Sequence, residues 1–267
     1  MTTAAKSPVA PEVSDGPLRV PPWQQFGALS SRNIVAALRQ GDAVLAFTQP
    51  LVFFVCFYVP LRRSLELPGA NYAQYLLPVI AAYGMCFSSM FAGDRAAREV
   101  VGGMATRLRS LPVPPWVPVS ARLSANLARS VVTLVGALVI GTVFGFRFHG
   151  VDTAVVFLVV LLAFGGGLTI ATDALGTATR NSQLSGTVLF GPQLLLILAS
   201  TGLVPAEGFP GWIQPFVRNQ PVSQITAALR GLADGRYVPE LGVAALWIVG
   251  LLVVGAVLAV RAEGRRA

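Results

Sequence analysis

The residue types that catalysis and metal binding need are scarce in this chain. It has one histidine, His149, and one lysine, Lys6. A single histidine cannot form a multi-histidine metal site or an H-E-x-x-H zinc motif. A phosphate-binding G-x-x-x-x-G-K-S/T loop needs a lysine directly after a glycine, whereas Lys6 follows Ala5. We therefore predict no catalytic residue, no metal site, no cofactor and no ATP site on this polypeptide.

The charged residues gather in short segments between apolar runs. The longest basic segment is 93–123, and its centre at 94–109 has helical character before several prolines stop the helix. That centre carries four charged residues among small ones, namely Arg98, Glu99, Arg107 and Arg109. A short charged helix that projects from a membrane bundle is suited to docking a soluble partner. The alternative is a solvated loop whose charges only set the topology.

The composition indicates which elements must position these charges. Of the 267 residues, 54% are hydrophobic and only 12% are charged, about half the charge of a typical soluble domain. The net charge of +8 could indicate a nucleic-acid partner. The arginines, however, lie between long apolar runs, which favours a membrane protein with no nucleic-acid partner.

Six apolar segments are long enough to cross a bilayer, which takes roughly 17–25 residues. They are predicted at about 43–60, 73–92, 125–145, 153–172, 186–204 and 241–260. An even number of spans places both chain ends on one side. With both ends assigned to the cytoplasm, 14 of the 20 Lys and Arg residues lie inside and six outside. The sequence therefore predicts a multi-pass protein of the plasma (inner) membrane with both termini cytoplasmic.

The residues before the first span divide into two parts. Residues 1–22 contain five prolines and no apolar core, and we expect a disordered cytoplasmic tail there. Residues 23–39 form an amphipathic helix with Trp23 and Phe26 on one face and Arg32 and Arg39 on the other. We interpret it as a helix on the inner membrane surface, with packing against protein as the alternative. The membrane domain would then be 40–267.

The segment 203–240 is too polar to span, yet it keeps large apolar side chains such as Trp212 and Phe216. Two short helices are predicted at about 210–218 and 221–232, each beginning at a proline, which helices accept in their first turn. We interpret this segment as a hairpin half-inserted into the outer rim of the membrane. The alternative is a folded surface loop.

These features together resemble a known family. An amphipathic helix precedes six spans, RE…GG…RLRSLPV follows span two at 98–113, and STGLVP…FPGWIQPFVRNQPVSQITAALRGL fills 200–232. The pattern resembles the membrane subunits of ABC-2-type exporters. More narrowly, it resembles the daunorubicin-resistance permeases and the permeases that export phthiocerol dimycocerosate lipids.

The resemblance implies a fold, partners and site residues. The fold would be an all-α integral membrane domain of six transmembrane helices, with an interfacial connecting helix and an outer re-entrant hairpin. The partners would be an ABC ATP-binding subunit and a second permease copy or a related permease. The cargo would be a lipid or a hydrophobic drug such as an anthracycline. The contacts with the ATPase would come from Arg98, Glu99, Arg107, Leu108 and Arg109, and the hairpin near the exit would include Trp212, Phe216, Asn219, Pro221 and Arg230.

Two other functions stay open on the sequence. One is an ion-coupled secondary transporter, although none of the six apolar centres contains a charged residue that could form an ion pathway. The other is a non-transporting scaffold of a lipid-synthesis complex. A neighbouring reading frame with a phosphate-binding loop would favour the ABC exporter.

Overall fold

The computed structural model describes residues 21–39, 41–64, 72–103, 114, 116–178 and 182–264. Within these ranges the regular structure is all helical, with no strand. The elements in chain order are α1 Pro22–Arg39, α2 Asp42–Ser64, α3 Tyr72–Val101, α5 Trp116–Val143, α6 Val151–Ala178, α7 Ser182–Leu198, the 3-10 turn η1 Ala206–Gly208, α8 Gln214–Asn219, α9 Pro221–Ala233 and α10 Glu240–Gly264. Residues 1–20 of the predicted tail and Arg107, Leu108 and Arg109 lie outside the described residues, whereas Pro22, the last residue of that tail, is the first residue of α1.

Five helices in the described part of the chain are long and apolar enough to cross a membrane: α2, α3, α5, α6 and α10. Helix α7 has 17 residues and contains Pro192. At about 1.5 Å per residue it extends about 25 Å, less than the roughly 30 Å of a bilayer core. The described helices therefore support five of the six predicted spans. The remaining span, predicted at 186–204 where α7 lies, stays a prediction.

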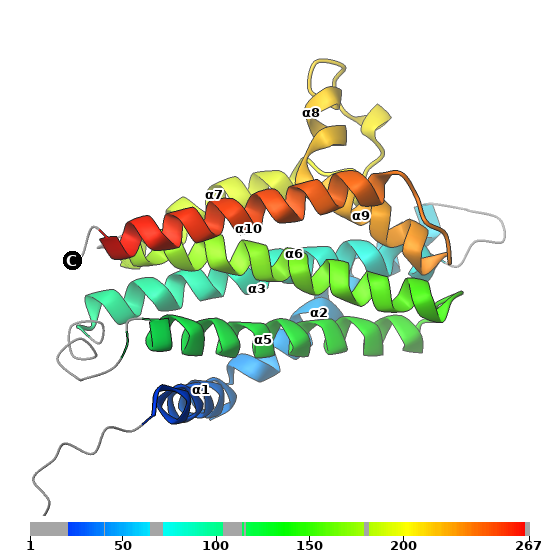
Figure 1. The fold of residues 1–267 in the computed structure, drawn as a ribbon. Coiled ribbons are helices and arrows are strands. Elements are labelled where there is room, and N and C mark those ends of the chain that lie inside the picture. Colours follow the sequence, from blue (N-terminus) through cyan, green and yellow to red (C-terminus); the bar gives the residue numbers. More distant parts are fainter. Residues whose placement is uncertain are drawn as a thin grey trace, which may run out of the picture.

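The long helices lie alongside one another, and α1 crosses near one end of them, where Figure 1 shows it almost end-on. Helix α3 is central, because it contacts α2, α5, α6, α7 and α9. Of the residues in its most apolar 18-residue stretch, 83% are buried. Two glycines allow especially close approach. A Cβ at Gly176 of α6 would overlap the carbonyl of Gly93 on α3, and one at Gly136 of α5 would meet the carbonyl of Phe47 on α2.

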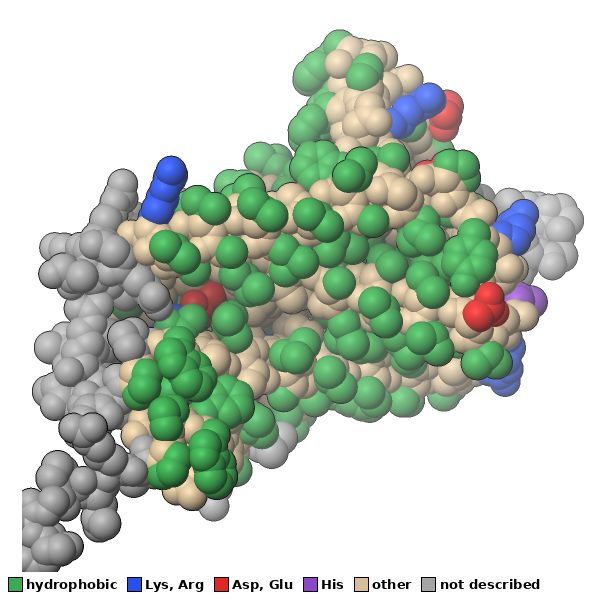
Figure 2. Space-filling model, in the orientation of Figure 1, with side chains coloured by type: hydrophobic (Ala, Val, Ile, Leu, Met, Phe, Trp, Pro, Cys, Tyr) green, Lys and Arg blue, Asp and Glu red, His purple; other side chains and the backbone are tan. Residues whose placement is uncertain are grey.

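The outward faces of these helices are apolar. Figure 2 shows hydrophobic side chains along the flank of the bundle, with charged side chains mostly toward its two ends and on the projecting α8 region. The exposed apolar residues of α10 illustrate the pattern: Val243, Leu246, Trp247, Val249, Val253, Val254, Val257 and Val260. An apolar belt of this kind is what a helix bundle presents to lipid.

The helix ends differ from several predicted boundaries. The segment 94–109 was expected to be a helix separate from the span at 73–92, but α3 runs unbroken to Val101. It then turns at Gly102–Gly103, where Gly103 has φ +71°, a conformation that favours glycine. Helix α5 begins at Trp116, nine residues before the predicted start of span three at 125. Helix α7 ends at Leu198, so the expected span 186–204 is too long at that end.

Candidate functional site at the α1 end of the bundle

Side chains of α3 and α5 meet in three rungs, each about one helical turn apart, at the bundle end where α1 lies. Arg122 Nη1 lies 3.3 Å from Glu99 Oε2, and Arg95 Nη2 donates to Asn126 Oδ1 at 2.8 Å. In the third rung the Arg129 guanidinium lies 4.6 Å from the centre of the Phe91 ring. The rungs repeat because the helices are antiparallel and residues three or four apart share a face. We call these six residues the polar ladder.

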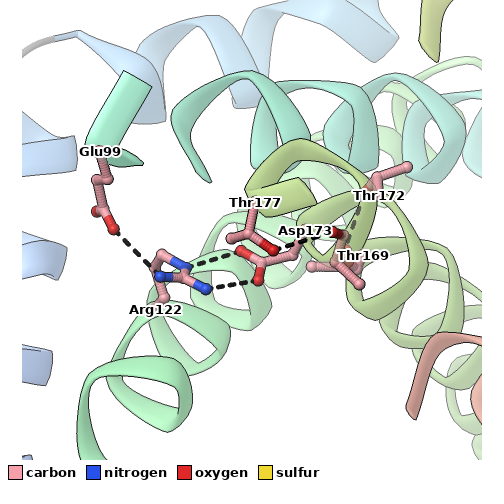
Figure 3. Close-up of polar contacts among 7 residues, drawn as sticks. Glu99, Arg122, Thr169, Thr172, Asp173 and Thr177 are labelled. Carbon is pink, nitrogen blue, oxygen red and sulfur yellow. Dashed lines mark hydrogen bonds and ion pairs between the residues drawn. The ribbon is translucent and has the colours of Figure 1, made fainter. Parts of the chain in front are cut away.

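A carboxylate from α6 anchors the first rung. Arg122 Nε donates to Asp173 Oδ1 at 2.8 Å and Arg122 Nη2 donates to Asp173 Oδ2 at 2.7 Å (Figure 3). The Asp173 side chain is 6% exposed and that of Arg122 is 16% exposed. Paired N–H···O bonds in a fork are among the strongest ionic contacts in proteins, so α5 and α6 are held firmly here.

A carboxylate from α2 anchors the other two rungs. Asp42 Oδ2 lies 2.8 Å from Arg95 Nη1 and 3.3 Å from Arg129 Nη1. Asp42 is the first residue of α2, directly after the turn at Gly41 that follows α1. The polar ladder and its two carboxylates therefore connect α2, α3, α5 and α6 at one end of the bundle.

The last turns of α3 carry the charges that are open to solvent at this end. The Arg98 side chain is 72% exposed and donates from Nε to Asp94 Oδ2 at 2.9 Å. Glu99 is 38% exposed, and its carboxylate also reaches buried Arg122. Glu99 therefore connects a partly accessible surface to the buried ion pair of α5 and α6.

Further along α3, buried polar groups connect this helix to α6 and α7. Thr172 Oγ1 on α6 donates to the carbonyl of Ser89 at 2.7 Å. Gln193 Nε2 on α7 donates to the carbonyl of Cys86 at 2.6 Å, and it lies 2.9 Å from Ser89 Oγ. Because lipid offers no competing water, such bonds hold neighbouring helices in register.

The segment between α7 and α10 begins deep in the bundle and ends at the far end. Directly after α7, Ser200 shares a hydrogen bond with Tyr83, which lies eleven residues inside α3. Gln220 Nε2, just before α9, donates to the Ala199 carbonyl at 2.6 Å. At the other end of α9, the Ala233 carbonyl accepts from Gln74 Nε2 at 3.1 Å, close to the first residue of α3. Helix α9 therefore rises from about mid-depth to the far end, while α8 projects from the bundle (Figure 1).

The structure separates the predicted hairpin residues into buried and exposed ones. Arg230 donates to the carbonyls of Gly202 and Tyr75, and its guanidinium lies 3.6 Å from the centre of the Tyr75 ring. Pro221 is the first residue of α9, and the Asn219 carbonyl accepts from Trp247 Nε1 at 3.1 Å. Trp212 and Phe216 are exposed on the projecting part. The predicted set thus includes both structural contacts and open apolar surface.

The predicted interfacial helix packs against protein and keeps exposed aromatic surface. On α1 Ser30 is buried, and Ser124 Oγ of α5 donates to its Oγ at 3.1 Å. Trp23 is 69% exposed, Phe26 is partly buried and Arg32 is exposed. Arg39 ends the helix, but its side chain lies outside the described residues. One face of α1 therefore rests on α5, and Trp23 is free to contact another surface.

The sequence reasoning missed the buried ionic contacts. Arg95, Arg122 and Arg129 were counted only among the Lys and Arg residues that set the topology, and Asp42 and Asp173 were not singled out. A signal was available, because Arg95 and Glu99 on α3 are four apart, as are Arg122 and Asn126 on α5. No group of three or more His, Cys, Asp or Glu residues in the described ranges could hold a metal ion.

Comparison with known proteins gives one family and several relatives. Residues 44–261 match the model of the ABC-2 family transporter protein. The chain is 34% identical over 224 residues to the doxorubicin resistance ABC transporter permease protein DrrB of Mycobacterium tuberculosis (strain H37Rv), covering 80% of this chain and 78% of that protein. It is 35% identical over 219 residues to the probable doxorubicin resistance permease DrrC of that strain, covering 79% and 78%. It is 28% identical over 207 residues to the daunorubicin resistance permease DrrB1 of Streptomyces coeruleorubidus, covering 76% and 70%.

Proposed function

The chain belongs to the ABC-2 family of transporter proteins, and on that premise we propose that it is the membrane-spanning permease subunit of an ATP-driven exporter. It would move a hydrophobic or amphipathic molecule outward while a separate subunit hydrolyses ATP. The names of its relatives concern doxorubicin and daunorubicin, which supports an anthracycline-type drug as one cargo. A long-chain lipid such as phthiocerol dimycocerosate is the other cargo that we propose.

The observation that carries this proposal is the link from Glu99 through Arg122 to Asp173. A separate ATPase can drive transport only if its motion reaches several helices of the permease. Glu99 is partly accessible at the end of α3, while Arg122 and Asp173 lie on α5 and α6. A push on the end of α3 would therefore pass to both helices through charge-assisted contacts rather than through a flexible loop.

We propose that the ATPase contacts Arg98 and Glu99 on α3, together with Arg107, Leu108 and Arg109, which lie outside the described residues. The chain has no lysine after a glycine with which to form its own phosphate-binding loop, so the nucleotide would bind on the partner. In this orientation the α1 end is cytoplasmic, both termini lie inside, and α1 rests along the inner leaflet.

The cargo would leave between two permeases, which are copies of this chain or related chains. We propose that α7 is the remaining membrane span, the fifth in chain order. The segments η1, α8 and α9 would form a half-inserted element at the exit. Its support is the path of α9, which runs from the depth of Tyr83 and Ser200 to the end of the bundle near Gln74. The exposed Trp212 and Phe216 would lie near the departing cargo.

The test is transport in everted membrane vesicles that contain this chain and its ATP-binding subunit. We expect uptake of doxorubicin when ATP is supplied and none with a non-hydrolysable analogue. Uptake that needs no ATPase and collapses with an ionophore would indicate an ion-coupled transporter instead. Unchanged uptake in vesicles that lack this chain would indicate a scaffold.

A further inference from the structure

One carboxylate serves two guanidinium groups where α2, α3 and α5 meet. Asp42 Oδ2 lies 2.8 Å from Arg95 Nη1 and 3.3 Å from Arg129 Nη1. The Arg129 side chain is 4% exposed, yet its Nε and Nη1 make no hydrogen bond to a described residue. The three side chains together carry a net charge of +1. This group therefore has more positive charge than its carboxylate balances, and buried Arg129 has N–H donors without a hydrogen-bond acceptor among the described residues.

Among the described residues, the neighbouring side chains do not supply the missing acceptor. Asn126 gives Arg95 a neutral oxygen at 2.8 Å, which adds no negative charge. Asp94 accepts from Arg98, and Asp173 is engaged by Arg122 on another helix pair. A buried charge without its counter-charge is costly, so an anion from outside the chain would stabilise this site.

An apolar strip begins at the same place. Phe91, over which the Arg129 guanidinium lies, is exposed. Along the α2–α3 surface the partly buried rings of Phe87 and Phe53 stack with centres 5.1 Å apart, and Phe53 and Phe57 stack at 6.4 Å. The strip runs from the charged end toward the middle of the bundle. A ligand that fits both features has an anionic head and a hydrocarbon tail.

We propose that this place binds an anionic phospholipid of the inner leaflet. The phosphate contacts Arg95, whose side chain is 28% exposed, and an acyl chain lies along Phe91, Phe87 and Phe53. When the phosphate takes Arg95, the Asp42 carboxylate is left to Arg129 alone, whose Nη1 it already approaches at 3.3 Å. Arg95 and Arg129 then each have an anionic partner. This lipid is a resident ligand, and its binding does not depend on ATP-driven export.

The test is native mass spectrometry of the purified full chain with equimolar phosphatidylglycerol and phosphatidylcholine. We expect retention of phosphatidylglycerol over phosphatidylcholine, and about tenfold weaker phosphatidylglycerol binding by Arg95→Gln, because a hydrogen bond to a charged group is lost. The control Arg236→Gln also removes one positive charge, but in an exposed loop at the far end, and should bind as the wild type does. Equal phosphatidylglycerol binding by all three proteins would overturn the proposal.

Two further measurements do not depend on Arg95→Gln folding. Asp42→Asn raises the net charge of the site to +2, so it should bind phosphatidylglycerol more tightly than the wild type, and unchanged or weaker binding would overturn the proposal. Millimolar inorganic phosphate should fail to displace the lipid, because it lacks the tail that contacts the aromatic strip. Full displacement would make this a site for free phosphate and would contradict the lipid assignment.

Discussion

Arg122 and Asp173 form a two-bond ion pair between α5 and α6, with distances of 2.8 Å and 2.7 Å, in a place that water barely reaches. Glu99 of α3 approaches the same guanidinium at 3.3 Å. Three helices therefore meet at one arginine, next to the surface where we propose that the ATPase binds. The predictions below separate the structural role of such contacts from their role in transport.

Asp173→Ala should be strongly destabilising. It leaves the Arg122 charge buried with only Glu99 nearby, and loss of one partner from a buried pair costs about 3–5 kcal/mol. The matched control is Glu207→Ala, because Glu207 pairs with Arg218 at 2.9 Å where both side chains are more than half exposed. Exposed pairs contribute about 0–1 kcal/mol. Thermal unfolding in detergent measures both variants, and equal losses would contradict the role given to Asp173.

Gly176→Ala should separate α3 from α6. The added Cβ would overlap the backbone carbonyl of Gly93, which cannot rotate away as a side chain could. Overpacking of this kind typically costs about 1–3 kcal/mol. Gly166→Ala on the same helix is the control, since its Cβ would meet nothing within 4 Å. A Gly176 variant as stable as the Gly166 variant would show that the two helices are not so close.

Tyr83 and Ser200 should be energetically coupled. Their hydroxyl groups share a buried hydrogen bond that holds the end of α7 against α3. A double-mutant cycle with Tyr83→Phe and Ser200→Ala should give a coupling energy of about 1 kcal/mol, within the range found between membrane helices. Strictly additive losses of unfolding free energy would contradict this contact.

Arg230→Ala should loosen the segment 199–213 without unfolding the bundle. Arg230 donates to the carbonyls of Gly202 and Tyr75, so its loss frees the chain directly after α7. Hydrogen exchange in 199–213 should become faster than in the wild type, while exchange in α3 should stay the same. Arg236→Ala, at an exposed position between α9 and α10, serves as the control. Exchange in 199–213 that is as slow as in the wild type would rule out this anchoring role.

The sequence predicted the helical parts of the fold well, because a bilayer demands long apolar segments. The predictions at 43–60, 153–172 and 241–260 lie within α2, α6 and α10. The sequence was misleading where charge began to replace hydrophobicity. Residues 94–101 read as a new helix, but a change in polarity does not break a helix, and α3 continues until Gly102 and Gly103.

The candidate site was only half predictable. Arg98 and Glu99 could be proposed as docking residues because they lie in a basic segment between two spans. The pairing of Arg122 with Asp173 could not, because it joins residues 51 positions apart and depends on how α5 and α6 pack. The sequence also did not predict that α9 begins near the middle of the bundle. That position depends on the hydrogen bonds of Gln220 to Ala199 and of Ser200 to Tyr83.

The most direct test of the central claim is transport by the Glu99→Ala/Arg107→Ala double variant in everted vesicles that contain the ATP-binding subunit. The account predicts that ATP hydrolysis continues while ATP-driven doxorubicin uptake falls at least about tenfold, which corresponds to about 1.4 kcal/mol of lost coupling. Asp234→Ala/Arg236→Ala, which removes an exposed pair that follows α9 at the other end of the bundle, should transport like the wild type. Unchanged uptake by the Glu99→Ala/Arg107→Ala variant would contradict the coupling role of the α3 end.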